Sequence, residues 1–175
     1  MEVVKTQIPG VLIINMKIYG DKRGFFTETH HQKTYSEAGI DCQFVQDNLS
    51  FSKKNILRGL HFQRQFPQAK LITVIKGEIF DVAVDLRPSS ETFGQWTGII
   101  LSGDNHKQFF IPQGFAHGFC VLSEDAYVHY KCTEFYHPED EDGIFWADSQ
   151  LNIDWPITNP IISTKDQNNS SFKNL

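Results

Sequence analysis

Short runs of β-branched and aromatic residues recur along this chain, and turn-forming residues separate them. The runs that read as strands are 11–14, 71–75, 79–86, 96–101, 108–111, 119–122 and 127–133. The segments between them are typical of tight turns: Lys76-Gly77, Arg87-Pro88-Ser89-Ser90, Ser102-Gly103-Asp104-Asn105 and Pro112-Gln113-Gly114. This spacing predicts an all-β sandwich or barrel rather than alternating βαβ units.

The length of 175 residues predicts a single domain that covers the whole chain, 1–175. One short helix is expected over 33–38, directly before Gly39. The polar segment 167–175 is expected to form a frayed tail.

Composition narrows the classes of partner. The formal net charge of −5, from 16 Lys and Arg against 21 Asp and Glu, argues against nucleic-acid binding. Cys42, Cys120 and Cys132 show no CxxC spacing, so neither a disulfide framework nor a thiolate zinc site is expected. No stretch approaches the roughly 20 apolar residues that cross a membrane, and we expect a cytoplasmic protein without a membrane partner.

The segment from Arg58 to Gln63 reads RGLHFQ and places His61 in a predicted strand. Nine residues later Lys70 lies in an otherwise apolar run, where an unpaired ammonium group is costly to bury. A structural histidine and a lysine on an edge strand are the plain alternatives. The functional alternative is a base and a cation that stabilises a developing oxyanion.

A second histidine, His117, follows Pro112 and Gly114 in a spacing that resembles the second motif of the cupins, which are small jelly-roll barrels. Metal-binding cupins carry a His-x-His pair in their first motif, but only His61 is present here. Two imidazoles without a carboxylate make a poor metal site. The sequence therefore predicts a cupin-type barrel with a few short helices and without a metal.

Other polar residues have less distinctive settings. Alternation places Tyr130 on one face of its strand, where a core tyrosine and an acid are equally consistent with the pattern. Asp81 and Asp85 share a face with Ile79 and Ala83, opposite a fully apolar face. We expect these two aspartates to face water or the edge of the other sheet.

Taken together, several motifs closely resemble the dTDP-4-dehydrorhamnose 3,5-epimerase family. These motifs are Arg23-Gly24-Phe25-Phe26, Gln46-Asp47-Asn48, Arg58-Gly59-Leu60-His61-Phe62-Gln63, Gln68-Ala69-Lys70-Leu71, the segment 77–87, the segment 111–119, Tyr130-Lys131-Cys132-Thr133, Ile153-Asp154-Trp155-Pro156 and Ser163-Thr164-Lys165-Asp166. The resemblance runs almost from end to end.

The resemblance implies cofactor-free epimerisation at C3 and C5 of a thymidine-diphosphate 4-keto-6-deoxy sugar. His61 would be the base, Asp166 its orienting partner, Lys70 the cation near the enolate oxygen, and Tyr130 the acid. Each proton that flanks the C4 ketone can be removed to give a conjugated enolate. A carboxylate on one imidazole nitrogen also favours basicity at the other.

The resemblance also implies binding roles and an assembly. Arg23 and Arg58 match diphosphate contacts, and Phe26 and Tyr136 match aromatic contacts to the thymine. Further nucleotide or sugar contacts match Glu28, Gln46, Asn48, His117, Glu141 and Lys165. Family members are homodimers whose N-terminal strands cross over, and the apolar run 11–14 is compatible with such an exchange.

One conflict and three alternatives stay open. Strict strand alternation puts Arg58 and His61 on opposite faces, so a bulge at Gly59, a reach around the barrel mouth or a second subunit must reconcile them. The alternative functions are an epimerase acting at one centre only, a nucleotide-sugar binding protein without catalysis, and a metal-dependent cupin oxygenase.

Overall fold

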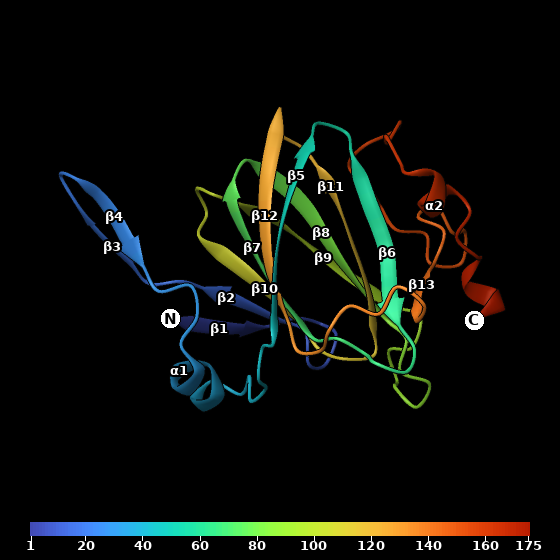
Figure 1. The fold of residues 1–175 in the computed structure, drawn as a ribbon, viewed down its shortest axis with the longest axis horizontal. Helices are drawn as coiled ribbons and strands as arrows, with labels where there is room; N and C mark the ends of the chain where they lie inside the picture. Colours follow the sequence, from blue (N-terminus) through green and yellow to red (C-terminus); the bar gives the residue numbers. More distant parts are fainter.

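Two facing β-sheets form a barrel in the computed structural model, which describes residues 1–175 (Figure 1). The six-stranded sheet has the order β1-β2-β10-β7-β12-β5, and the five-stranded sheet has the order β13-β6-β11-β8-β9. A separate hairpin is formed by β3 and β4. The predicted all-β, cupin-like class is confirmed.

The paired strands are antiparallel throughout both sheets. The strands are β1 (Glu2–Lys5), β2 (Leu12–Asn15), β3 (Ile18–Asp21), β4 (Gly24–Thr27), β5 (Gln46–Lys53), β6 (Leu57–Gln63), β7 (Lys70–Lys76), β8 (Glu78–Asp85), β9 (Trp96–Ser102), β10 (Lys107–Ile111), β11 (Phe115–Val121), β12 (Asp125–Cys132) and β13 (Glu141–Gly143). The helices are α1 (Gln32–Glu37), α2 (Thr164–Gln167) and the 3-10 helix η1 (Phe172–Asn174).

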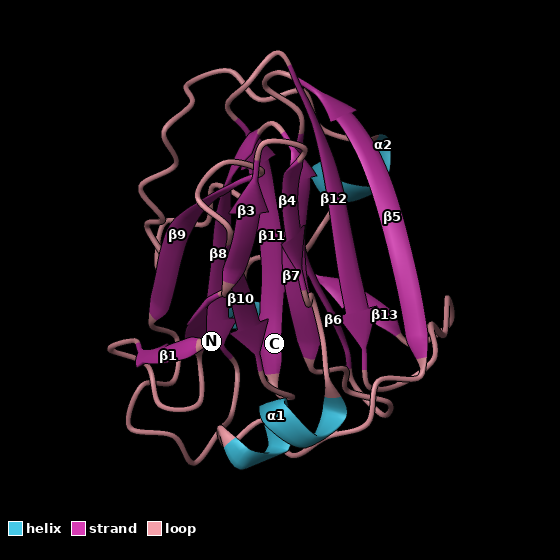
Figure 2. Cartoon of the chain, turned by 90° about the vertical axis from the view of Figure 1, so that its left-hand side faces the viewer, coloured by secondary structure: helices cyan, strands magenta, loops and turns pink.

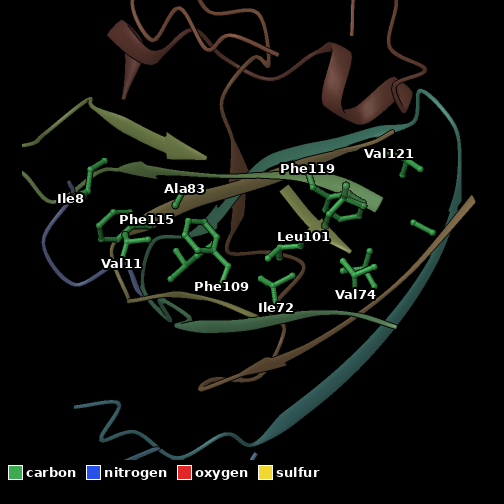
Figure 3. Close-up of a cluster of buried hydrophobic side chains, with 14 residues drawn as sticks. Ile8, Val11, Ile72, Val74, Ala83, Leu101, Phe109, Phe115, Phe119 and Val121 are labelled. Atoms are coloured by element: carbon green, nitrogen blue, oxygen red, sulfur yellow. The ribbon is translucent and has the colours of Figure 1, made fainter. Parts of the chain in front are cut away.

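The largest apolar cluster lies between the two sheets (Figure 3). Ile72 and Phe109 come from the six-stranded sheet, while Leu101 and Phe115 come from the five-stranded sheet. Ile72, Leu101 and Phe109 have no exposed surface. Burial of side chains of this size contributes about 1.5–3 kcal/mol each, so this cluster holds the sheets together.

A second apolar cluster covers the outer face of the five-stranded sheet. Val82 and Val84 of β8 pack there against Leu151 and Trp155 of the C-terminal segment. Both faces of β8 are therefore buried, and the prediction for Asp81 and Asp85 was wrong, since neither has exposed surface. In this strand, alternate side chains point into two different buried layers, so neither face is exposed to water.

A β-bulge in β6 resolves the conflict between Arg58 and His61. His61 lies opposite His117 and Arg58 lies opposite Phe119, so β6 uses one residue more than β11 over this stretch. At the bulge, a Cβ on Gly59 would lie 2.5 Å from the Gly118 Cα, and Gly59 has a φ of 123°. Only glycine fits such an approach, and the bulge brings Arg58 and His61 to one face.

The β3–β4 hairpin projects from the barrel at the end of the molecule opposite α2 and the C-terminus (Figure 1). Helix α1 covers the outer face of the six-stranded sheet near its foot, where Tyr35 and Ile40 join a third apolar cluster with Leu71 (Figure 2). The predicted helix over 33–38 is confirmed, shifted by one residue. None of the helices has the length and apolar character needed to cross a membrane.

The C-terminal segment makes contacts that oppose fraying. Ser171 Oγ and the Phe172 N–H both donate to the Asp148 carboxylate, at 2.7 and 2.9 Å. The Phe172 ring lies 5.3 Å from that of Phe93. Frayed dynamics for residues 167–175 stay a prediction, while the structure identifies the contacts that resist them.

Candidate active site

A cavity of about 310 Å³ opens between the two sheets. Its lining is mainly polar and consists of Gln46, Asn48, Ser50, Arg58, His61, Gln68, Lys70, His117, Phe119, Tyr130, Tyr136 and Glu141. Most of the residues predicted for the site lie in this lining. An adjoining cavity of about 390 Å³ shares only Gln68 and Lys70 with it.

The two walls of the cavity carry different chemistry. His61 on β6 and His117 on β11 belong to the five-stranded sheet and lie opposite each other in register. Lys70 on β7 and Tyr130 on β12 belong to the six-stranded sheet. A ligand in the cavity therefore has imidazoles on one side and a phenol and an ammonium group on the other.

His61 forms a tight pair with Asp166, which α2 brings in from 105 residues away. The His61 Nε2 lies 2.7 Å from Asp166 Oδ1, and Asp166 Oδ2 accepts a hydrogen bond from the Gly59 N–H at 3.2 Å. Burial opposes ionisation of Asp166, but the contacts with His61, Gly59 and Ser163 outweigh it and hold the pKa of this carboxyl group below its usual range. An ionised carboxylate takes the Nε2–H and leaves Nδ1 free to accept a proton.

A second imidazole–carboxylate pair lies beside the first. The His117 Nε2 lies 2.9 Å from Asp81 Oδ1, and both side chains are buried. Burial lowers the pKa of His117, against the opposing influence of Asp81. Asp81 was missed in the sequence, because a strand with two buried faces gives no sign of which one meets a cavity.

Lys70 and Tyr130 make no side-chain hydrogen bond or ion pair with the rest of the chain. Burial lowers the pKa of the Lys70 ammonium group, and it raises the pKa of the Tyr130 hydroxyl. Tyr130 is protonated at neutral pH and has a proton to give. Both groups are free to interact with a ligand.

The rim of the cavity is held by polar contacts among predicted binding residues. The Tyr136 hydroxyl donates to Glu141 Oε2 at 3.0 Å, and Lys165 forms an ion pair with the same carboxylate. Although burial opposes it, these contacts hold the pKa of Glu141 below its usual range. Lys165 does not line the cavity itself but is paired with Glu141, which does. Asp166 is placed in the same way by its pair with His61.

The other rim residues cluster around β5. Gln46 Nε2 donates to Asn48 Oδ1 at 3.0 Å, and Asn48 Nδ2 lies 3.6 Å from Cys132 Sγ. The Arg58 Nε donates to Ser52 Oγ at 3.0 Å, and Arg58 lines the cavity. These side chains present amide and guanidinium donors suited to oxygen-rich groups.

Three predicted binding residues lie away from this cavity. Arg23 and Phe26 belong to the β3–β4 hairpin and are exposed, with Phe26 68% exposed. Phe26 and Glu28 line a separate groove of about 470 Å³. Within one chain the structure therefore does not bring Arg23, Phe26 and Glu28 to His61.

Ser50, Gln68 and Phe119 line the cavity but were not predicted for the site. Ser50 follows Gln46 and Asn48 at the period of two that places strand residues on one face, and Phe119 follows His117 in the same way. This periodicity would have found both. Gln68 precedes β7 and carries no such signal.

The chain contains no group of three or more His, Cys, Asp or Glu side chains arranged to hold a metal ion. Each cavity imidazole is bonded through Nε2 to its own carboxylate. This donor set differs from the His-x-His and glutamate ligands of metal-binding cupins. The sequence-based expectation of a metal-free, cofactor-free protein stays a prediction.

Fold and site together define a cupin-type barrel whose cavity carries imidazole–carboxylate pairs of a kind suited to proton transfer. A sequence profile described as dTDP-4-dehydrorhamnose 3,5-epimerase matches residues 5–174. A dTDP-4-dehydrorhamnose 3,5-epimerase from Methanothermobacter thermautotrophicus is 54% identical over 168 residues, which cover 94% of this chain and 91% of that protein. The chain belongs to the dTDP-4-dehydrorhamnose 3,5-epimerase family.

Solved structures agree with this relationship. A dTDP-6-deoxy-D-glucose-3,5-epimerase from Legionella pneumophila in complex with dTDP-4-keto-L-rhamnose superimposes with a TM-score of 0.96 at 54% identity, covering 98% of this chain and 93% of that one. A dTDP-4-dehydrorhamnose 3,5-epimerase from Bacillus anthracis with TDP and PPi bound gives a TM-score of 0.96 at 45% identity, covering 98% and 99%.

Proposed function

We propose that this protein epimerises dTDP-4-dehydro-6-deoxy-D-glucose at C3 and C5 to give dTDP-4-dehydro-L-rhamnose. The observation that carries the proposal is the placement of an imidazole base and a phenol acid on opposite walls of one cavity. A proton taken from one face of a sugar carbon and returned to the other inverts that carbon. The similarity to epimerases supports the same reaction and the same substrate class.

In each inversion, His61 Nδ1 takes the proton from the carbon next to the C4 ketone. The C–H bond pair becomes the C=C bond of an enolate, and the negative charge moves to the C4 oxygen. Lys70 stabilises this oxygen, an interaction that is stronger in the transition state than in the ground state. Tyr130 then returns a proton to the opposite face, and exchange with solvent restores both side chains.

Solvent exchange on dTDP-4-dehydro-6-deoxy-D-glucose in heavy water tests the proposal. We expect deuterium at both C3 and C5, measured by NMR and mass spectrometry, and none at either centre with His61→Ala. Deuterium at a single carbon would instead indicate a single-centre epimerase. No exchange with the wild-type protein would contradict the proposal and favour a nucleotide-sugar binding protein without catalysis. Metal analysis of the same sample tests the remaining alternative, a metal-dependent cupin oxygenase.

We further propose that the protein acts as a homodimer in which the N-terminal β3–β4 hairpin crosses to the partner; the run 11–14, expected to suit such an exchange, instead pairs with β1 and β10 of its own chain. The β3–β4 hairpin supports this, because Tyr19, Phe25 and Phe26 are 53%, 60% and 68% exposed on a projecting element (Figure 1). Arg23, Phe26 and Glu28 would then complete the site of the second copy.

Mixing inactive His61→Ala chains with Phe26→Ala chains tests the exchange. Mixed dimers contain one site with an intact base and an intact hairpin, so activity should rise above that of either variant alone. Mixtures that gain no activity, or a monomeric mass in solution, would contradict the exchange.

A further inference from the structure

Tyr136 lies on a segment that is not part of any β-sheet. We call residues 134–137 the Tyr136 strap; they belong to no helix or strand. No backbone–backbone hydrogen bond reaches Glu134, Phe135 or Tyr136. Phe135 and Tyr136 are 58% and 47% exposed, so packing alone does not hold the strap.

Three glutamine side chains bond the backbone of the strap instead. Gln68 Nε2 donates to the Glu134 carbonyl at 2.8 Å, and the Tyr136 N–H donates to Gln46 Oε1 at 2.9 Å. Gln63 Nε2 donates to the Phe135 carbonyl at 3.2 Å, and the His137 N–H donates to Gln63 Oε1 at 2.8 Å. Four consecutive residues are thus each held by a glutamine.

Gln63 has the central place in this arrangement. It bonds the backbone on both sides of Tyr136, it donates a further hydrogen bond to the Phe66 carbonyl at 2.7 Å, and it is only 6% exposed. It also lies on β6 two residues after His61. A buried amide with these partners cannot rotate without leaving polar groups unpaired.

We propose that Gln63 and Gln68 are positioning residues that, with Gln46, hold the Tyr136 ring at a fixed height above the cavity mouth. The inference rests on the proposed function, with the Tyr136 ring, which lines the cavity, in contact with the thymine as the family resemblance implies. Gln63 lies on the same strand as His61. It therefore fixes the distance between the Tyr136 ring, which contacts the thymine, and the His61 imidazole, which takes the proton. The strap therefore sets how far a nucleotide sugar extends into the cavity.

Binding of dTDP and of inorganic pyrophosphate separates positioning from general stability, because only dTDP carries a thymine. With Gln63→Met, which keeps the side-chain length, we expect dTDP affinity to fall about tenfold and pyrophosphate affinity to stay within about twofold. Gln68→Met, which removes one hydrogen bond from a less buried residue, should weaken dTDP binding about threefold. Isothermal titration calorimetry gives both affinities.

Gln108→Met is the matched control. Gln108 is also buried and bonds through both amide atoms, to Thr29, Thr73 and Tyr35, but it does not line the cavity. It should lower thermal stability without changing the ratio of dTDP to pyrophosphate affinity. If Gln63→Met does not fold, Gln68→Met decides by the same ratio.

Unchanged dTDP affinity, or an equal loss of both ligands, would overturn the positioning role while leaving the proposed function intact. Failure of the wild-type protein to bind dTDP would overturn the proposed function first. The two failures are therefore distinguishable in one set of titrations.

Discussion

Two imidazole–carboxylate pairs lie side by side at the cavity, and they differ in the exposure of the imidazole and in the hydrogen bonds of the carboxylate. In the first pair, the His61 side chain is 26% exposed and Asp166 uses both oxygens as acceptors. In the second, the His117 side chain is 8% exposed and Asp81 Oδ2 has no hydrogen-bond partner. The first pair leaves its imidazole accessible to a ligand, whereas burial in the second lowers the pKa of His117 and favours the neutral imidazole.

The origin of each carboxylate explains this difference. Asp166 comes from α2, where Ser163 caps the turn and the Asp166 N–H donates to Ser163 Oγ at 3.1 Å. Asp81 comes from β8, a strand buried on both faces, and its backbone partner in β11 is Phe119. A carboxylate added from a separate segment can be fully hydrogen-bonded, whereas one inside a sheet takes the partners that the sheet allows.

Glutamine substitutions at the two histidines give the largest expected contrast. Glutamine places an Nε2–H near the position of the imidazole Nε2–H, so each aspartate keeps a donor while the basic Nδ1 is lost. We expect His61→Gln to slow deuterium incorporation at C3 and C5 by about 10²- to 10⁴-fold. His117→Gln should leave the rate at saturating substrate nearly unchanged and raise the Michaelis constant by about tenfold, through weaker substrate binding.

Equal losses in the two variants would show that the pairs share the proton-transfer role. The measurement is the initial rate of exchange at saturating substrate, with the Michaelis constant determined separately. Circular dichroism of both variants controls for folding.

Asparagine substitutions at the two aspartates should separate the pairs by stability. Asp166→Asn replaces one of two oxygen acceptors with an N–H, so either the Gly59 N–H loses its partner or the His61 imidazole must change tautomer, and we expect a loss of about 1–3 kcal/mol in the free energy of unfolding. Asp81→Asn replaces a buried carboxyl group whose Oδ2 has no partner and keeps an acceptor for His117, so we expect stability to change by less than about 1 kcal/mol. Urea unfolding at pH 7 compares them, and a larger loss from Asp81→Asn would reverse the assignment.

The amino-acid pattern predicted the strands that build the apolar core, including β7, β11 and β12, which also carry Lys70, His117 and Tyr130, but it missed the polar strand β5 of the site. The run 79–86 was identified because β-branched residues dominate it, and it matches β8 closely. Strand β5 was not predicted, because Gln46, Asn48 and Ser50 turn a polar face toward the cavity. A strand that lines a polar site lacks the apolar alternation by which strands are found.

Long-range contacts set a second limit on prediction. Nothing near Asp166 in the sequence indicates that it meets His61, because 105 residues separate them, and only the family resemblance suggested the pair. The resemblance named Arg58 and His61 together against strict alternation, and the bulge at Gly59 supplies the physical reason. For Arg23 and Phe26 the same resemblance still awaits a test in the assembled protein.

The pH dependence of stability gives the smallest and sharpest contrast between the pairs. Burial lowers the pKa of His117 from 6.5, so the unfolded chain binds this proton more tightly, and stability is lost as the pH falls from about 6.5. The pKa of Asp166 is held below 3.8, so its contribution is present above about pH 3.8 and lost below it. His117→Gln should therefore flatten the curve just below pH 6.5, and Asp166→Asn should flatten it only below pH 3.8. Urea unfolding at half-unit intervals from pH 3 to 7 resolves the two ranges.

Burial also lowers the pKa of His30, so a shallower slope must remain in His117→Gln. A slope between pH 5 and 6.5 that is identical to that of the wild-type protein would show that His117 carries its proton in the folded state, and the contrast between the two pairs would fail.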